Sequence, residues 1–118
     1  MKFEFEQNRE ILTVKIQGEL DHHGARALRE SIDNEIMASA ARGLIIDLAG
    51  LEIMDSSGIG IIMGRCKLME TLGGHVCVAG ARAAIKKVIL LSGLGRLVGL
   101  CETAAEGTNI LRSTKKIV

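Results

Sequence analysis

The chain has 118 residues, of which 47% are hydrophobic and 25% are charged, and its formal net charge is +1. This length accommodates one domain, which we expect to span residues 1–118, and the composition is that of a folded protein. The near-neutral charge and the absence of Trp and Tyr leave no signature of a nucleic-acid-binding surface or of a basic surface for anionic membranes.

The predicted elements of the first third are a hairpin and then a helix. Residues 2–7 and 11–17 alternate apolar and polar side chains, which is the period-two pattern of half-buried strands, and only a short turn separates them. We expect the second strand to end at Gly18, with the stretch GELDHHG as a loop. From His23 to Ala41 the residues follow a period near 3.6, which predicts an amphipathic helix, and Gly43 follows where a helix stop is expected.

Strands and helices then alternate to the end of the chain. GLIIDLAG, at residues 43–50, is a short apolar run between glycines and is typical of a strand buried on both faces. The expected elements after it are a helix at 56–74, a strand at 75–80, a helix at 81–93, a strand at 95–101 and a helix at 102–113. The helix at 81–93 is expected to have an apolar face made of Ala84, Ile85, Val88, Ile89 and Leu91. The order β-β-α-β-α-β-α-β-α predicts an α/β fold, with one small mixed sheet packed by helices and parallel neighbours joined by right-handed crossovers.

Cysteine usage and the N-terminal segment indicate a protein of the cytoplasm. Cys66, Cys77 and Cys101 lie far apart, without a CxxC pair or a metal-ligand spacing, and we expect them to be buried thiols in a reducing compartment. The segment MKFEFEQNRE has no apolar core of a signal peptide, and charged residues interrupt the other apolar runs before they reach bilayer length. We therefore expect a cytoplasmic protein with no metal, no cofactor and no membrane partner.

The stretch LEIMDSSGIGIIMG places four polar or small residues, Asp55, Ser56, Ser57 and Gly58, between two apolar segments. They follow a predicted buried strand and open the next helix, at the carboxyl edge of the sheet, where such folds carry their sites. One interpretation is structural, because Asp and Ser are preferred N-caps whose side-chain oxygen accepts a free backbone N–H. The other is functional: an exposed serine at a helix N-terminus receives a phosphate without unfolding its helix, and the added charge disrupts a partner docked there.

Enzymatic interpretations of this motif find little support in its spacing. Gly58 and Gly60 form a G-x-G that lacks the third glycine of a dinucleotide fingerprint, and the sequence contains no Walker loop. Met54 stands where a G-x-S-x-G hydrolase elbow around Ser56 needs a glycine, so we expect no catalysis. Gly60 and Gly64 are instead expected to let their helix lie close on the sheet.

A second polar loop contains Asp21, His22 and His23. Two adjacent histidines without a third ligand at a suitable spacing make a poor zinc site, so the simpler expectation is that Asp21 or a histidine caps the first helix. Because this loop also follows a strand, it is a candidate to lie beside the Asp55–Gly58 loop and to form one composite surface with it.

Three stretches carry a resemblance to a known family: GELDHH at 18–23, DLAGLEIMDSSGIGIIMGR at 47–65 and LLSGLGRLV at 90–98. They resemble the STAS domain of the anti-sigma factor antagonists, also called anti-anti-sigma factors, and the resemblance covers essentially the whole chain. The first stretch is most similar to the antagonists of the sporulation sigma-F pathway, rather than to those of the general-stress branch. The chain departs from the family pattern at residues 80–83, where many relatives have a Ser-Pro turn, and matches it only loosely from Glu102 onward.

The resemblance implies a STAS fold and a function in sigma factor regulation. Members of the family bind an anti-sigma factor that is itself a serine kinase, and thereby release the sigma factor. The resemblance implies that the kinase phosphorylates Ser56, that a metal-dependent phosphatase removes the phosphate, and that Asp21 lies at the partner surface. The resemblance also implies that Asp55, Ser57 and Gly58 shape the loop that presents Ser56. We expect Ser57 to cap the helix and Ser56 to accept the phosphate, although the sequence also allows these two roles to be exchanged. The alternative is a nucleotide- or anion-binding domain that uses the Asp55–Gly58 loop.

Overall fold

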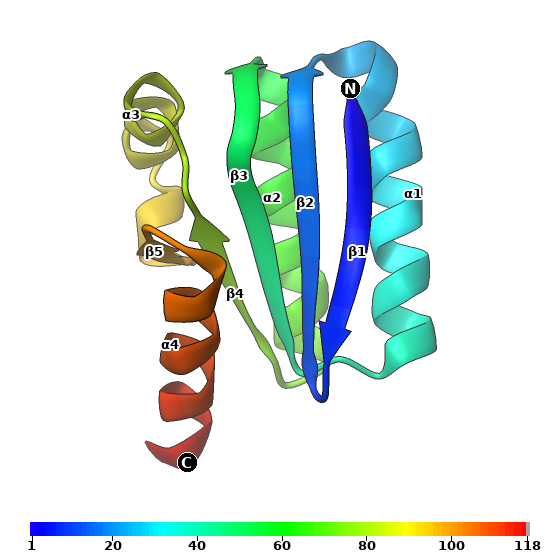
Figure 1. The fold of residues 1–118 in the computed structure, drawn as a ribbon, viewed down its shortest axis with the longest axis vertical. Helices are drawn as coiled ribbons and strands as arrows, with labels where there is room; N and C mark the ends of the chain where they lie inside the picture. The colour runs from blue at the N-terminus through cyan, green and yellow to red at the C-terminus, as the bar shows by residue number, and fades with distance from the viewer. Residues whose placement is uncertain (118) are drawn as a thin grey trace.

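Five strands in the order β1-β2-β3-β4-β5 form the sheet of the computed structural model, which describes residues 1–117 (Figure 1). The strands are β1 (Lys2–Asn8), β2 (Ile11–Leu20), β3 (Gly43–Met54), β4 (His75–Ala79) and β5 (Gly99–Cys101). The helices are α1 (His22–Ser39), α2 (Ser56–Thr71), α3 (Ala83–Leu91) and α4 (Ala104–Ile117), with a 3-10 turn η1 (Leu94–Arg96) that the sequence analysis did not anticipate. β1 pairs with β2 antiparallel and the other neighbours pair parallel, so the predicted element order and mixed sheet are confirmed.

The sheet separates two cores because successive side chains of a strand point to opposite faces. Leu12 and Val14 of β2 point into the larger core, together with the buried face of α1 and α2. Ile45 of β3 points into the smaller core on the other face, where Leu111 of α4 meets it. Figure 1 shows the consequence: α1 and α2 lie together behind the sheet, whereas α4 lies beside β4 and β5.

Two predicted strand ends were wrong, and both lie next to the motif residues. β2 does not end at Gly18 but continues to Leu20, because Gly18 adopts a φ of +92° at an irregularity in the pairing with β3. β3 runs to Met54, beyond the predicted end at residue 50. Helix α1 accordingly begins at His22, directly after β2, where the sequence predicted a longer loop.

Two predicted packing patterns were also wrong. In α3, Ile85 and Ile89 are buried, whereas Val88 and Leu91 are 41% and 78% exposed. This helix has nine residues and lies at the margin of the sheet, so it buries only one i, i+4 stripe. Gly60 does not bring α2 close to the sheet, since a Cβ built on it, as on Gly64, would meet nothing within 4 Å.

The cysteines are free thiols, and only one of them is fully buried. Cys77 is buried, whereas Cys66 and Cys101 are half-buried, so the expectation of three buried thiols holds for Cys77 alone. Burial raises the pKa of the Cys66 and Cys77 thiols to about 11. At neutral pH these two side chains therefore remain protonated and pack as small apolar groups.

Candidate functional site

The candidate site lies where the neighbouring parallel strands β2 and β3 end. Leu20 and Met54 are register partners at these two ends, and each is followed at once by an aspartate that begins a helix. Asp21 precedes α1, and Asp55 precedes α2. The structure therefore brings the two polar loops side by side at the carboxyl edge of the sheet, at the top of Figure 1.

Asp21 is the N-cap of α1. Its Oδ1 accepts hydrogen bonds from the backbone N–H of His23 at 3.0 Å and of Gly24 at 3.2 Å. The amide of Gly24, and next that of His23, stabilise the ionised carboxylate and lower the pKa of Asp21, with a further contribution from the charges of the histidines. Asp21 is thus an exposed, ionised group at neutral pH, as its predicted place on a partner surface requires.

Asp55 has the same role at the start of α2. Its Oδ1 accepts a hydrogen bond of 2.8 Å from the backbone N–H of Ser57, and its carbonyl accepts one of 3.0 Å from Gly58. The capping role that we expected for Ser57 therefore belongs to Asp55. The reason is geometric: Asp55 has the extended backbone of an N-cap (φ −91°, ψ −173°), whereas Ser57 already lies within the helix.

Ser56 is the first residue of α2 and is exposed to solvent. Within residues 1–117, no hydrogen bond from a protein group holds its hydroxyl. Ser57 differs, because it is half-buried and lines a groove between α1 and α2. Of the two serines, Ser56 is therefore the one whose hydroxyl is more accessible to another protein.

Gly58 fixes the start of α2 against the ends of the strands. It is buried, and a Cβ built on it would clash with the side chain of Met54 and lie 3.3 Å from Cδ2 of Leu20. The glycine is thus required by the close approach of backbone to side chain, and its φ plays no part. This contact holds the loop that carries Ser56 in place.

The flank of the site is basic, which the sequence analysis did not predict. The groove beside Ser57 has a volume of about 450 Å³ and is lined on the α1 side by His22, Arg26 and Arg29. The sequence signal for this face is their i, i+4, i+7 spacing, which places the three on one side of a helix. The rings of His22 and His23 stack with centroids 4.4 Å apart, so His23 is part of this end of α1 as well.

The arrangement offers an exposed hydroxyl at a sheet edge that also carries two capping carboxylates. One carboxylate oxygen of Asp55 accepts a backbone N–H, and no hydrogen bond among the described residues links a histidine side chain to Ser56. No group of three or more His, Cys, Asp or Glu residues that could hold a metal ion occurs in the part of the chain that the structure describes. None of the helices within residues 1–117 has the length and apolar character that crossing a membrane demands.

Comparisons with known proteins give a family match, similar sequences and similar structures. The STAS domain profile matches residues 2–107. The anti-sigma F factor antagonist of Paenibacillus polymyxa is 34% identical over 98 residues, which cover 83% of this chain and 84% of that protein. The structure of the anti-sigma factor antagonist SpoIIAA in its unphosphorylated form superposes with a TM-score of 0.84 at 31% identity, covering 95% of this chain and 97% of the other. The Bacillus cell fate determinant SpoIIAA in its phosphorylated form gives a TM-score of 0.74 at 31% identity, covering 92% and 97%.

Proposed function

The chain belongs to the STAS domain family, and from this premise we propose that it is an anti-sigma factor antagonist controlled by phosphorylation of Ser56. In its unphosphorylated form it binds an anti-sigma factor and thereby releases the sigma factor. The observation that carries the proposal is the exposed, unbonded hydroxyl of Ser56 at the first position of α2, directly after the cap Asp55 and at the sheet edge that also carries the cap Asp21. Sporulation is the pathway that the resemblance to the sigma-F antagonists favours.

Phosphorylation at Ser56 is tolerated by the helix that carries it. A phosphate adds a charge of about −1.5 to −2 at neutral pH, and a helix N-terminus has a partial positive charge. The cap bond from Ser57 to Asp55 involves no atom of the Ser56 side chain, so it persists after modification. The local fold therefore remains, and the change is confined to the surface.

The same phosphate is not tolerated by a partner that covers this surface. Asp21 and Asp55 already make the edge acidic, and a partner that docks here has to match two carboxylates and an uncharged hydroxyl. A dianion added beside them has to be desolvated when the partner docks, and it brings a bulky group into an interface fitted to a hydroxyl, which costs several kcal/mol of binding free energy. Binding is thus lost without any change of backbone conformation.

The remaining partners follow from this switch. The anti-sigma factor is the serine kinase that phosphorylates Ser56, and a metal-dependent phosphatase restores the hydroxyl. The chain itself performs no catalysis and requires no cofactor, and it acts in the cytoplasm, where the sigma factor is. Asp21, Asp55, Ser57 and Gly58 contribute by capping, orienting and supporting the presented serine.

Intact-mass spectrometry after incubation with the anti-sigma factor and Mg-ATP tests the proposal. Wild type and Ser57→Ala are expected to gain one phosphate, and Ser56→Ala is expected to gain none while still binding the ADP-loaded anti-sigma factor. If Ser56→Ala is still phosphorylated but Ser57→Ala is not, the function stands and the phosphorylated residue is Ser57. Binding of the anti-sigma factor by neither form of the chain would refute the function itself.

A further inference from the structure

The groove between the first halves of α1 and α2 begins beside the serine loop. Among the residues that line its volume of about 450 Å³ are His22, Arg26 and Arg29 of α1 and Ser57, Gly60 and Ile61 of α2. Ser57 directly follows Ser56, so the groove is continuous with the surface on which we place the anti-sigma factor. Gly60 leaves room on the α2 side, because a Cβ built there would meet nothing within 4 Å. A segment of a docked protein therefore has space to enter the groove.

One guanidinium group of this groove has no carboxylate partner. Arg26 forms an exposed ion pair of 3.1 Å with Glu30, four residues along the same helix. One turn further along both helices, Arg65 forms an ion pair of 2.8 Å with Asp33. Arg29 is exposed, and its side chain makes no ion pair or hydrogen bond with any group of residues 1–117. Three guanidinium groups thus share two carboxylates, which leaves Arg29 as the uncompensated charge.

The position of Arg29 is electrostatically unfavourable in the free protein. Burial lowers the pKa of the Arg65 guanidinium; the carboxylate of Asp33 opposes this shift, and the charge of Arg29 adds to it. Arg29 is therefore close enough to Arg65 for the two like charges to repel each other. Nη1 of Arg65 is, in addition, buried without a hydrogen-bond partner among the residues that the structure describes. A carboxylate brought to Arg29 from another molecule would offset this excess of positive charge.

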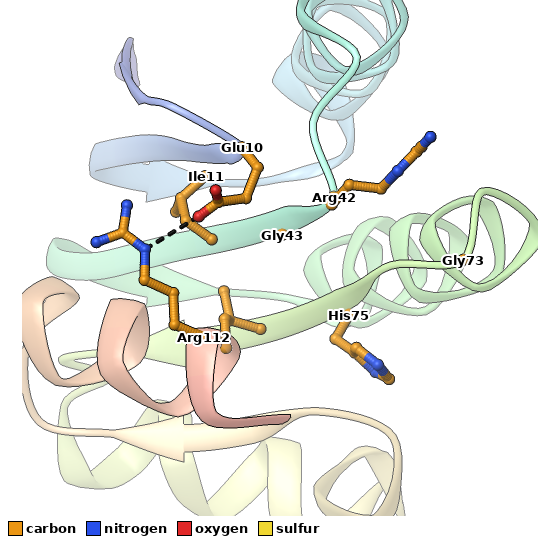
Figure 2. Close-up of a pocket in the computed structure, with 8 residues that line it drawn as sticks. Glu10, Ile11, Arg42, Gly43, Gly73, His75 and Arg112 are labelled. Atoms are coloured by element: carbon orange, nitrogen blue, oxygen red, sulfur yellow. Dashed lines mark hydrogen bonds and ion pairs between the residues drawn. The ribbon is translucent and has the colours of Figure 1, made fainter. Parts of the chain in front are cut away.

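The guanidinium groups around the cavity at the opposite end of the sheet already have partners. This cavity, of about 290 Å³, lies between the starts of β2 and β3, the turn before β4, and α4 (Figure 2). Nε of Arg112 lies 3.0 Å from the carboxylate of Glu10. Figure 2 shows Arg42 pointing away from Ile11, and its Nη1 donates to the carbonyl of Leu72 at 3.2 Å. The unpaired cation thus distinguishes the groove between α1 and α2 from this cavity.

We propose that the groove between α1 and α2 receives an acidic segment of the anti-sigma factor, one carboxylate of which pairs with Arg29. The inference rests on the proposed function, because it concerns the same partner on a continuous surface. Asp21 and Asp55 at the sheet edge are complementary to positive groups on the partner, whereas the groove beside them is complementary to negative groups. A partner that matches both parts is held in one orientation, since like charges would meet in the reversed one.

Calorimetric titration of the whole chain with the ADP-loaded anti-sigma factor tests the inference with two variants of one residue. Arg29→Glu is expected to weaken binding about tenfold or more, because its charge repels the acidic segment. Arg29→Gln is expected to weaken binding about threefold or more, because only the attraction is lost. Arg9→Glu is the matched control, an exposed arginine in the turn between β1 and β2 at the other end of the sheet. It is expected to bind within about twofold of wild type, since salt screens a charge so far from the groove.

Two further measurements separate docking from an effect on the fold. Added NaCl is expected to weaken the binding of wild type more than that of Arg29→Gln, since salt screens the ion pair that the variant lacks. The free energy of unfolding of Arg29→Glu, from urea unfolding, is expected to be unchanged or higher, because the repulsion with Arg65 is removed. Binding of Arg29→Glu as tight as that of wild type would overturn this inference and leave the proposed function standing. Failure of wild type to bind the anti-sigma factor would refute the proposed function, and this inference with it.

Discussion

The backbone N–H of Asp55 donates a hydrogen bond of 3.2 Å to the carbonyl of Leu20. Leu20 immediately precedes Asp21, so this single bond joins the residue that caps α2 to the strand end that leads into the cap of α1. The distance between the two caps is therefore set by the pairing of β2 and β3, and not by flexible loops. Strand register therefore places the start of α2, which carries Ser56, at the same edge of the sheet as the start of α1.

The first prediction concerns charge at Ser56. Ser56→Asp is expected to lower the affinity for the ADP-loaded anti-sigma factor about tenfold or more, because a charge that has to be desolvated replaces an uncharged hydroxyl in the docking surface. The same change is expected to leave the free energy of unfolding unchanged or slightly higher, since an acid in the first turn interacts favourably with the helix dipole. Calorimetric titration and urea unfolding measure the two quantities separately.

Ser56→Asn is the control for this prediction, because it has nearly the same shape as the aspartate and no charge. It is expected to bind much more tightly than Ser56→Asp. If the two variants bind equally weakly, bulk and not charge decides the loss. An Asp variant that binds as well as wild type would contradict the electrostatic switch.

The second prediction contrasts two glycines of α2. Gly58→Ala is expected to destabilise the protein by about 1–3 kcal/mol, because the new Cβ clashes with Met54 in a packed environment. Gly60→Ala is expected to stabilise it by about 0.5–1 kcal/mol, since Gly60 is exposed, helical and has open space around its Cα. Urea unfolding of both variants measures the difference. Equal effects in either direction would show that helix propensity alone governs both positions.

The order of elements and the carboxyl-edge location of the motif could be predicted from the sequence because each rests on local signals. The alternating residues 11–17 lie in β2 and the apolar run 43–50 lies in β3, as predicted, and Asp21 is the N-cap of α1. The strand ends could not be predicted, because Gly18 reads as a stop in sequence. In the structure Gly18 has a positive φ, but the residues on both sides of it continue to pair with β3, so the strand does not end there. Such a continuation depends on pairing with residues that are distant in sequence.

The supporting and flanking parts of the site depend on tertiary contacts, and the sequence did not reveal them. Nothing in the local pattern distinguishes Gly58, which is pressed against Met54, from Gly60, which faces solvent. Arg26 and Arg29 read as ordinary surface residues of an amphipathic helix until α2 is placed alongside α1. Residue type and spacing placed two serines at the start of a helix, and the resemblance to the STAS family singled out Ser56, whereas the packing around them required the structure.

The third prediction concerns pH and Asp21. The amides of Gly24 and His23 lower the pKa of Asp21 from its ordinary value of 3.8, so the folded state binds its proton less readily than the unfolded state. The resulting stabilisation is fully present above the unfolded pKa, and it is lost as pH falls through the lower folded pKa. Asp21→Asn still caps the helix but does not titrate. The stability difference between wild type and this variant, from urea unfolding, is expected to shrink as pH falls below about 4. A difference that is constant with pH would contradict this assignment.

The last prediction concerns the ion pair that joins α1 to α2. Nε of Arg65 lies 2.8 Å from Oδ1 of Asp33, but the two side chains differ in exposure, at 7% for Arg65 and 35% for Asp33. Burial lowers the pKa of the Arg65 guanidinium; the carboxylate of Asp33 opposes this shift, and the nearby charge of Arg29 adds to it. Removal of either partner therefore has unequal consequences.

Asp33→Ala leaves the guanidinium buried and unpaired beside Arg29, and we expect it to cost about 3 kcal/mol of unfolding free energy. Arg65→Met is expected to cost clearly less, about 1 kcal/mol, because it fills the space with an apolar chain and leaves a carboxylate that water reaches. Arg26→Met removes an exposed i, i+4 pair with Glu30, and its expected cost of about 0.3–0.5 kcal/mol gives the scale of a surface ion pair. Urea unfolding of the three variants measures the order. A larger loss in Arg65→Met than in Asp33→Ala would mean that α1 and α2 are held together by the packing of the arginine stem and not by its charge.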